Sequence, residues 1–201
     1  MCARYELSDY LNDSKMVPLF EIMEREYPGQ YKTGEIFPGD AAPAIISSVG
    51  RPGQTSRGDA RLVPVPAVFG FPGFKGRELI VNARSETAEE KKTFSEGFRE
   101  RRAVLPASGF YEWSRDRDKI KYLFETGSAR IFYMCGIYGI FDGIYRFVIL
   151  TRAAEGAVSG IHERMPVIIG ESDVRPYITD LSAAQKLITA SAPVLTRSRA
   201  E

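Results

Sequence analysis

Apolar residues recur at two different spacings along the chain, and each spacing predicts one type of element. Residues 16–27 carry apolar side chains three or four positions apart, which is the spacing of an amphipathic helix. Pro18 fits the first turn of this helix, and Pro28 with Gly29 ends it. We therefore expect a helix over residues 16–27.

A longer helix is expected at about residues 88–101. Thr87 and Glu90 have the spacing of a capping box just before it. Phe94 and Phe98 then repeat at i and i+4, which places both rings on one face.

Two short helices are predicted near the C-terminus, over residues 173–179 and 182–189. Ser182 and Gln185 have capping-box spacing and would open the second of them. We therefore interpret residues 181–201 as a C-terminal helix and tail.

The strongest strand signal is a hairpin. Residues 131–141 and 144–150 are apolar runs that flank Asp142 and Gly143, a dipeptide typical of a two-residue hairpin turn. Residues 48–59 are expected to form a surface loop. Shorter strands are predicted over residues 44–46, 61–65, 103–105, 110–113 and 167–169.

Many short strands, few helices and no regular βαβ alternation favour an α+β fold. The expected sheet is mainly antiparallel and barrel-like, with a few short flanking helices. A length of 201 residues fits one domain over residues 1–201.

Composition excludes several classes of protein. Hydrophobic residues make up 44% of the chain and charged residues 26%, so a wholly disordered chain is excluded. The formal net charge is only +1, so a site for a polyanion requires local clustering of arginines. The N-terminus has charges where a signal peptide is apolar, and the run at residues 131–141 is too short for the ~20 residues that span a bilayer. We expect a cytoplasmic protein that does not associate with a membrane.

Two cysteines and one histidine are the candidates for nucleophilic chemistry. Cys135 lies in an apolar run and is interpreted as a small buried side chain. Cys2 and His162 have structural interpretations too, but a thiol near a histidine is the usual arrangement of an activated sulfur nucleophile. Three such residues cannot supply the four ligands of a structural zinc site, so we expect no metal and no cofactor.

Two further motifs contain polar residues that local structure does not fully explain. In NARSET at residues 82–87, helix capping explains the hydroxyls but not Asn82 or Arg84. In GFYEW at residues 109–113, Glu112 either faces water or faces inward, where desolvation would raise its pKa and suit it to proton transfer.

The order of the motifs resembles the SOS-response-associated peptidase (SRAP) family of abasic-site processing proteins. The resemblance extends from residue 2 to about residue 180. It implies a single-domain α+β fold that binds single-stranded DNA, acts as a monomer and joins the nucleoid when DNA is damaged. It also implies that the N-terminal cysteine becomes covalently linked to the ring-opened sugar of an abasic site. The motifs that carry it are MCARY at residues 1–5, FGFPGF at 69–74, NARSET at 82–87, PASGFYEW at 106–113 and HERMP at 162–166.

The resemblance also implies roles for individual residues. Cys2 resembles the covalent nucleophile, and three residues match the other active-site positions: Asn82, Glu112 and His162. Arginines at three positions match those that contact DNA phosphates, namely Arg4, Arg84 and Arg164. Two residues match positions that line the same groove, Pro43 and Thr151. Phe69 and Phe71 would stack on unpaired bases.

The sequence departs from the family pattern at two places. Ala3 stands where the family usually has Gly, and Val68-Phe69 replaces a usual Arg-Trp pair. The second change removes a cation and a larger aromatic ring, so it bears on DNA affinity rather than on the chemistry.

The chemistry of Cys2 agrees with the resemblance. Once Met1 is removed, Cys2 offers an α-amine and a thiol on adjacent carbons, and the amine has an ordinary pKa of ~7.7–8.0. The amine can form an imine with the sugar aldehyde, and the thiol can then close a thiazolidine. Glu112 would move protons, Asn82 would orient Cys2 or Glu112, and His162 would serve the sugar hydroxyl or the adjacent phosphate.

Two alternative functions remain open at this stage. Cys2 could act as the nucleophile of a thiol peptidase or autopeptidase, with Glu112 or His162 as the base. Alternatively, the chain could be a non-catalytic module that binds single-stranded nucleic acid, an interpretation that Val68 and Phe69 favour.

Overall fold

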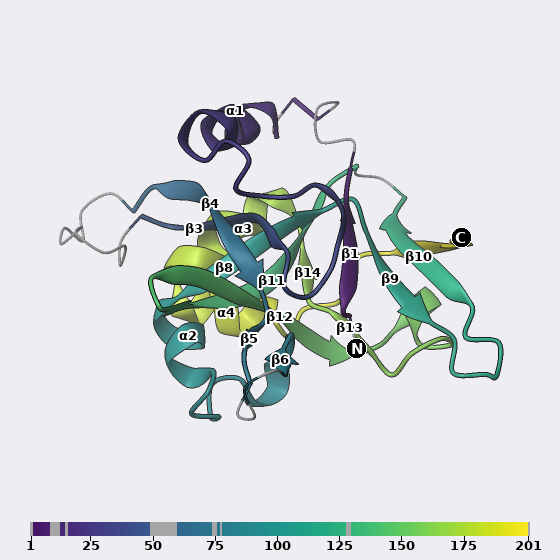
Figure 1. Ribbon diagram of the computed structural model, residues 1–201. Helices are drawn as coiled ribbons and strands as arrows, with labels where there is room; N and C mark the ends of the chain where they lie inside the picture. Colours follow the sequence, from purple (N-terminus) through teal and green to yellow (C-terminus); the bar gives the residue numbers. More distant parts are fainter. Residues whose placement is uncertain are drawn as a thin grey trace.

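The computed structural model describes residues 2–8, 13, 14, 16–48, 60–73, 76, 78–127 and 130–200 (Figure 1). Most of the expected loop at residues 48–59 therefore lies outside the described residues.

Five strands close into a barrel that surrounds the main core. Their order around the barrel is β4, β3, β8, β11, β12 and back to β4. Every pairing is antiparallel except that of β4 with β12, which is parallel and completes the closure. The predicted α+β class with a mainly antiparallel, barrel-like sheet is confirmed. The barrel strands are β3 (Ala41–Ser47), β4 (Leu62–Phe69), β8 (Arg102–Ala107), β11 (Phe132–Phe141) and β12 (Ile144–Ala153).

The hairpin between β11 and β12 forms where the sequence predicts it. Asp142 and Gly143 both adopt left-handed backbone conformations, with φ of 51° and 78°. Positive φ at both central residues defines the turn type whose twist matches that of the flanking strands.

Short strands extend the barrel at its rims. β7 (Asn82–Arg84) pairs in parallel with β12, and β13 (Arg164–Pro166) pairs antiparallel with it. β14 (Ile168–Ile169) pairs with β11. β5 (Phe71–Pro72) and β6 (Leu79–Ile80) form a separate two-stranded ribbon.

A second, five-stranded antiparallel sheet carries both ends of the described chain. Its order is β15-β10-β9-β1-β2. The sequence predicts only β9 among these strands, and the tail expected at the C-terminus instead contains β15. The strands are β1 (Arg4–Leu7), β2 (Gly34–Ile36), β9 (Gly109–Trp113), β10 (Lys121–Thr126) and β15 (Leu195–Arg199).

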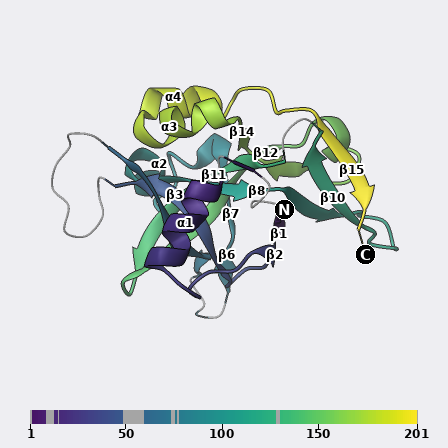
Figure 2. The ribbon, with the colours of Figure 1, turned by 90° about the horizontal axis from the view of Figure 1, so that it is seen from above.

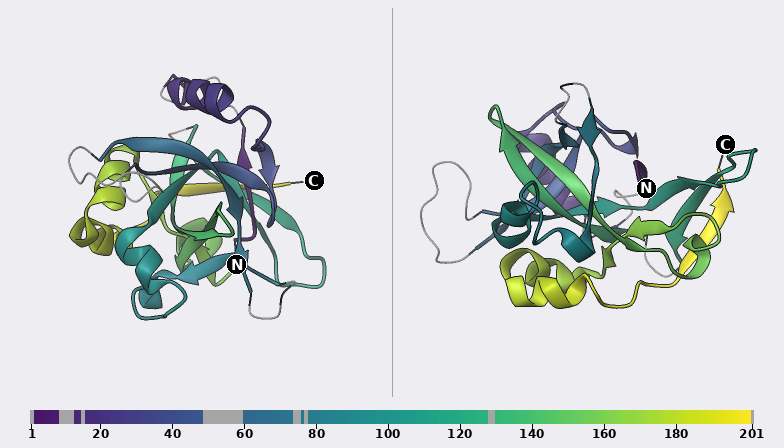
Figure 3. Two further views of the ribbon diagram at one scale, coloured as in Figure 1. Left: turned by 60° about the vertical axis from the view of Figure 1, so that its left-hand side comes forward. Right: turned by 90° about the horizontal axis from the view of Figure 1, so that it is seen from below.

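The helices cover the barrel from two sides. α1 (Val17–Glu26) contacts β4 and confirms the first predicted helix, with Pro18 in its first turn. α2 (Ser95–Glu100) and α3 (Glu171–Thr179) pack on β8 and β11. α4 (Leu181–Leu187) lies against α3, and Figure 2 shows this pair apart from α1. Figure 3 (right) shows the same pair on the opposite side of the molecule from β15.

Two predictions about helix boundaries are wrong. The helix expected at residues 88–101 is only α2, preceded by a 3-10 turn η2 (Ser85–Thr87) and further turns. Phe94 and Phe98 need a single helical turn to reach the core, so their spacing does not require a longer helix. α4 is capped by Asp180, whose side chain accepts a hydrogen bond from Ala183 N at 3.1 Å, and not by Ser182.

Arg102 on β8 holds the ends of two helices together. Its guanidinium donates to the carbonyls of Phe98 (2.7 Å) and Arg99 (2.5 Å) near the end of α2. It also donates to Tyr177 (2.6 Å) and Ile178 (3.0 Å) near the end of α3. A buried cation therefore satisfies carbonyls that helix ends leave unpaired.

None of the helices in the described part of the chain is long and apolar enough to span a membrane.

Candidate active site

Cys2 lies two residues before the start of β1 and is fully buried. Its thiol donates to the carbonyl of Arg4, with an Sγ to O distance of 3.7 Å. Burial raises the pKa of this thiol well above its ordinary value, and the charge of Glu112 raises it further. At neutral pH the sulfur is therefore a neutral thiol rather than a thiolate.

Asn82 joins the barrel to the N-terminal strand. It begins β7, where it pairs with Ile149 of β12, and its Nδ2 donates to the carbonyl of Cys2 at 2.9 Å. Its Oδ1 is buried and accepts no hydrogen bond from the described residues. Asn82 thus fixes the backbone of Cys2 and keeps one acceptor available beside it.

Glu112 faces inward, which answers the question that its motif leaves open. It lies on β9, the neighbour of β1, and is only 3% exposed. Burial raises the pKa of its carboxyl above the ordinary value. A buried carboxyl with a raised pKa is suited to take up and release a proton.

His162 lines a cavity of about 320 Å³ together with Ser114 and Tyr122. The side chains of Arg115 and Glu163 form an ion pair at this cavity. His162 Nδ1 lies 3.0 Å from the backbone N of Arg164 and 3.2 Å from the carbonyl of the same residue, so Arg164 holds the ring in place whichever ring nitrogen carries the proton. Desolvation lowers the pKa of His162, which favours the neutral ring.

The three predicted phosphate-binding arginines have different surroundings. Arg4 lies between two aromatic rings, with its Cζ 4.4 Å from the centre of Phe37 and 4.9 Å from Trp113. Arg84 is exposed at the end of β7. Arg164 forms a two-pronged ion pair with Glu86 and also donates to the carbonyl of Thr151.

Two of these partners are not predicted from the sequence. Glu86 lies within the NARSET motif, and an acid two residues after a candidate phosphate-binding arginine is a signal that could have been used. Phe37 carries no local signal, because only the pairing of β1 with β2 brings it near Arg4.

The predicted stacking residues must be corrected. Phe69 has no exposed surface and stacks on Phe147 with ring centres 5.0 Å apart. Phe71 is 3% exposed and packs against Phe94 and Phe141. Both rings are part of the core, so neither can stack on a DNA base in this conformation.

The two predicted groove residues are buried as well. Pro43 lies in the middle of β3, paired with Pro66 of β4. Thr151 is 1% exposed, and its hydroxyl lies 3.4 Å from the carbonyl of Ala83. Thr151 still reaches the site through its own carbonyl, which accepts from Arg164 at 2.5 Å.

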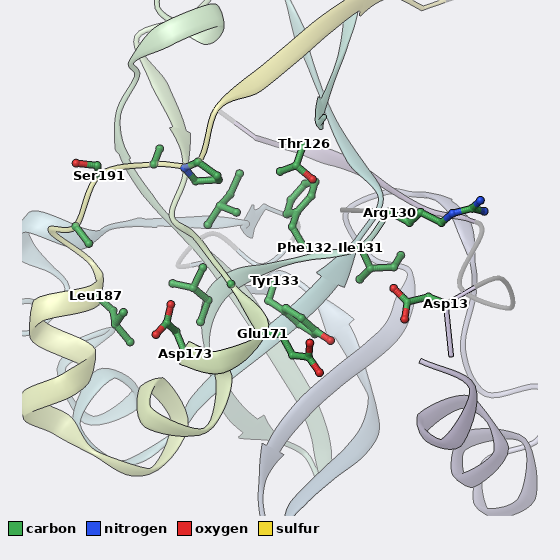
Figure 4. A pocket seen from close by; sticks show the side chains of 16 residues that line it. Asp13, Thr126, Arg130, Ile131, Phe132, Tyr133, Glu171, Asp173, Leu187 and Ser191 are labelled. Carbon is green, nitrogen blue, oxygen red and sulfur yellow. The ribbon is translucent and has the colours of Figure 1, made fainter. Parts of the chain in front are cut away.

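A separate cavity of about 550 Å³ lies between the start of β11, the N-terminus of α3 and the segment after α4 (Figure 4). Tyr133, Glu171 and Asp173 are among the side chains that line it. None of the predicted site residues lines this cavity. Across the described part of the chain, no group of three or more His, Cys, Asp or Glu residues could hold a metal ion.

The chain matches a known family. The family model described as "SOS response associated peptidase (SRAP)" matches residues 1–198. The chain therefore belongs to the SRAP family.

Similar proteins with curated names are abasic site processing proteins. YoqW of Bacillus subtilis (strain 168) is 28% identical over 202 residues, covering 94% of this chain and 86% of the relative. YedK of Escherichia coli (strain K12) is 28% identical over 185 residues, covering 89% and 79%. A crystal structure of a protein from Bacteroides thetaiotaomicron has the same fold, with a TM-score of 0.73, 18% identity and coverage of 100% of this chain and 92% of that one.

Proposed function

We propose that this protein processes abasic sites in single-stranded DNA by forming a covalent thiazolidine link through Cys2. The observation that carries the proposal is the hydrogen bond from Asn82, on the barrel, to the carbonyl of buried Cys2, with Glu112 buried on strand β9 beside β1 in the second sheet. The printed names of the relatives, abasic site processing proteins, support the same class of substrate.

The reaction proceeds in two bond-forming steps. After Met1 is removed, the α-amine of Cys2 attacks the aldehyde carbon of the ring-opened sugar, and loss of one water gives an imine. The thiol then adds across the C=N bond, with sulfur bonding to carbon and the thiol proton passing to nitrogen. Water is the only leaving group, so no oxidant, reductant or cofactor is required.

The state of the thiol favours this order of steps. A buried thiol with a raised pKa is a weak nucleophile towards a peptide carbonyl, because the thiolate is the attacking species in thiol peptidases. It is, however, suited to add to an imine while a neighbouring base accepts its proton. Glu112 is that base, and its raised pKa lets it return the proton to nitrogen.

The remaining residues orient and bind the substrate. Asn82 fixes the carbonyl of Cys2, and its Oδ1 can accept from the reacting amine or from a sugar hydroxyl. His162, whose neutral form is favoured by desolvation, serves the sugar hydroxyl or the adjacent phosphate. Arg4, Arg84 and Arg164 contact the phosphates, which makes binding sensitive to salt.

Intact mass after incubation with an abasic single-stranded oligonucleotide tests the proposal. We expect protein lacking Met1 to gain the mass of the oligonucleotide minus one water, and Cys2→Ala to give no stable adduct. Cys135→Ala is the matched control, because Cys135 is equally buried but lies in β11 within the core. An adduct that persists in Cys2→Ala, or its absence in protein lacking Met1, would contradict the proposal.

The same preparation separates this function from the alternatives. A thiol peptidase would cleave unrelated peptides at a rate that depends on Cys2. A non-catalytic module would bind abasic and undamaged strands equally and form no covalent product.

A further inference from the structure

Glu86 and Arg164 form an ion pair at the edge of the candidate site. Nη1 of Arg164 lies 2.6 Å from Oε1 of Glu86, and Nη2 lies 2.7 Å from Oε2. Two parallel N–H to oxygen bonds are also the geometry in which a guanidinium binds a phosphate. The carboxylate of Glu86 therefore occupies the donors that a DNA phosphate would use.

The two partners differ in how firmly they are held. The side chain of Arg164 is 16% exposed, and its Nη2 also donates to the carbonyl of Thr151 at 2.5 Å. The side chain of Glu86 is 49% exposed and projects from the short turn η2. If the pair opens, Glu86 can swing into solvent while the Thr151 carbonyl keeps Arg164 in place.

Arg84 provides the contrast on the same segment. It is exposed, and it forms no ion pair with the described residues. The charge of Arg84 also helps to lower the pKa of Glu86, but only Arg164 is held by Glu86 in a two-pronged ion pair. The charge of Arg164 is balanced until Glu86 is displaced.

We propose that Glu86 masks Arg164 in the free protein and gives way to a DNA phosphate on binding, so that Glu86 sets the affinity for undamaged single strands. This inference rests on the proposed function, since it takes Arg164 to be a phosphate contact. A masked arginine lowers the affinity for the large excess of intact DNA. Selectivity for abasic sites then depends on the covalent step at Cys2.

Binding of an undamaged oligothymidylate at several salt concentrations tests this role. Glu86→Gln should bind about tenfold more tightly at low salt, and its salt dependence should steepen by about 0.7 in log–log slope, the value for one phosphate on a single strand. Glu86→Asp keeps the charge but is one methylene too short to hold both contacts, and it should also bind more tightly.

Two controls separate unmasking from a general change of charge. Glu90→Gln removes a nearby exposed carboxylate that forms no ion pair with the described residues, so its affinity should change much less. In an Arg164→Ala background, Glu86→Gln should bring a much smaller gain, because the residue that it unmasks is absent and only its weaker effect on Arg84 remains.

Each other result overturns the inference. Weaker binding by Glu86→Gln would mean that Glu86 positions Arg164 for the phosphate instead of masking it. A gain of undiminished size without Arg164, or one equalled by Glu90→Gln, would reduce the effect to general electrostatics. Unchanged binding in a protein that captures abasic DNA overturns this inference alone. A wild-type protein that neither binds single strands nor captures abasic DNA overturns the proposed function as well.

Discussion

Arg102 and Glu112 are both ionisable side chains in the interior, but their surroundings stabilise the charge of Arg102 and disfavour the charge of Glu112. Arg102 is 5% exposed and donates to four carbonyls at the ends of α2 and α3. Glu112 is 3% exposed, and burial raises its pKa, so its charged form is disfavoured. The first region uses a buried charge to hold the fold together. The second holds a carboxyl whose charged form is disfavoured, which lowers stability at neutral pH and suits the proton transfer proposed above.

The largest expected effect is on the rate at which the protein captures abasic DNA, and its absence would contradict the contrast between Arg102 and Glu112. Glu112→Gln keeps the size and shape of the side chain but cannot titrate, so capture of abasic DNA should slow by about 10²–10⁴-fold. Time courses by intact mass measure this, with the exposed Glu125→Gln on β10 as the control. Capture at the wild-type rate would leave proton transfer to His162.

Glu112→Gln also tests whether the buried carboxyl lowers the stability of the folded protein. Because the pKa of Glu112 is raised, the folded state binds this proton more tightly than the unfolded chain does. The stability that this carboxyl contributes is present below its unfolded pKa and is lost as the pH rises through the folded pKa. Glu112→Gln should therefore melt at or above the wild-type temperature at neutral pH. The difference should shrink as the pH falls toward about 4.3, the ordinary Glu value.

Arg102→Met should have the opposite effects: it should lower stability and leave the capture of abasic DNA unchanged. It leaves the carbonyls at two helix ends without their donor, which should cost about 3–5 kcal/mol. For a chain of this size, the melting temperature should fall by roughly 6–20 °C. Capture per folded molecule should not change at low temperature. Arg99→Ala, which breaks only an exposed ion pair to Glu89, should stay within about 1 kcal/mol of wild type.

Asn82→Ala should have an intermediate effect on the chemistry. It removes one orienting hydrogen bond to Cys2, so capture should slow by about threefold to tenfold. Binding of undamaged single strands should not change, because Asn82 acts on Cys2 and not on a phosphate. An equal loss of binding would assign Asn82 to the DNA contact instead.

Arg84→Ala should give the smallest effect and the one most dependent on salt. Binding should weaken a few-fold at low salt, and the log–log slope should flatten by about 0.7. Arg25→Ala on α1, which is exposed and paired only with Glu26 among the described residues, is the control. Unchanged affinity at low salt would place the DNA-binding surface away from β7.

Local signals predicted the local parts of the fold. The turn at Asp142 and Gly143 needs two residues with positive φ, and that requirement is visible in the sequence. β15 was missed because four of its five side chains are exposed and polar residues dominate it, so its only reason to be a strand is pairing with β10. Pairing between segments some 70 residues apart leaves no local pattern.

In the candidate site too, the sequence indicates some features and leaves out those that depend on long-range pairing. The candidate roles of Cys2, Asn82 and Glu112 came from family resemblance, and their proximity follows from the pairing of strands that no local pattern fixes. Phe69 was assigned to stacking because it occupies a position that resemblance associates with DNA, but its neighbour Phe147 becomes visible only in the closed barrel. Position in a motif therefore does not indicate exposure.

The pairing of strand β12 has a consequence for the rates at which backbone amide hydrogens exchange with solvent. It pairs with four other strands, β11, β4, β7 and β13, whereas β1 forms only three register pairs with each of its two neighbours. Amide hydrogens of β12 should therefore exchange with solvent only on global unfolding, while those of β1 exchange through smaller openings. Asn82 is anchored to the slowly exchanging strand, and Cys2 precedes the faster one. A covalent bond at Cys2 should thus slow exchange in β1 and leave β12 as it was.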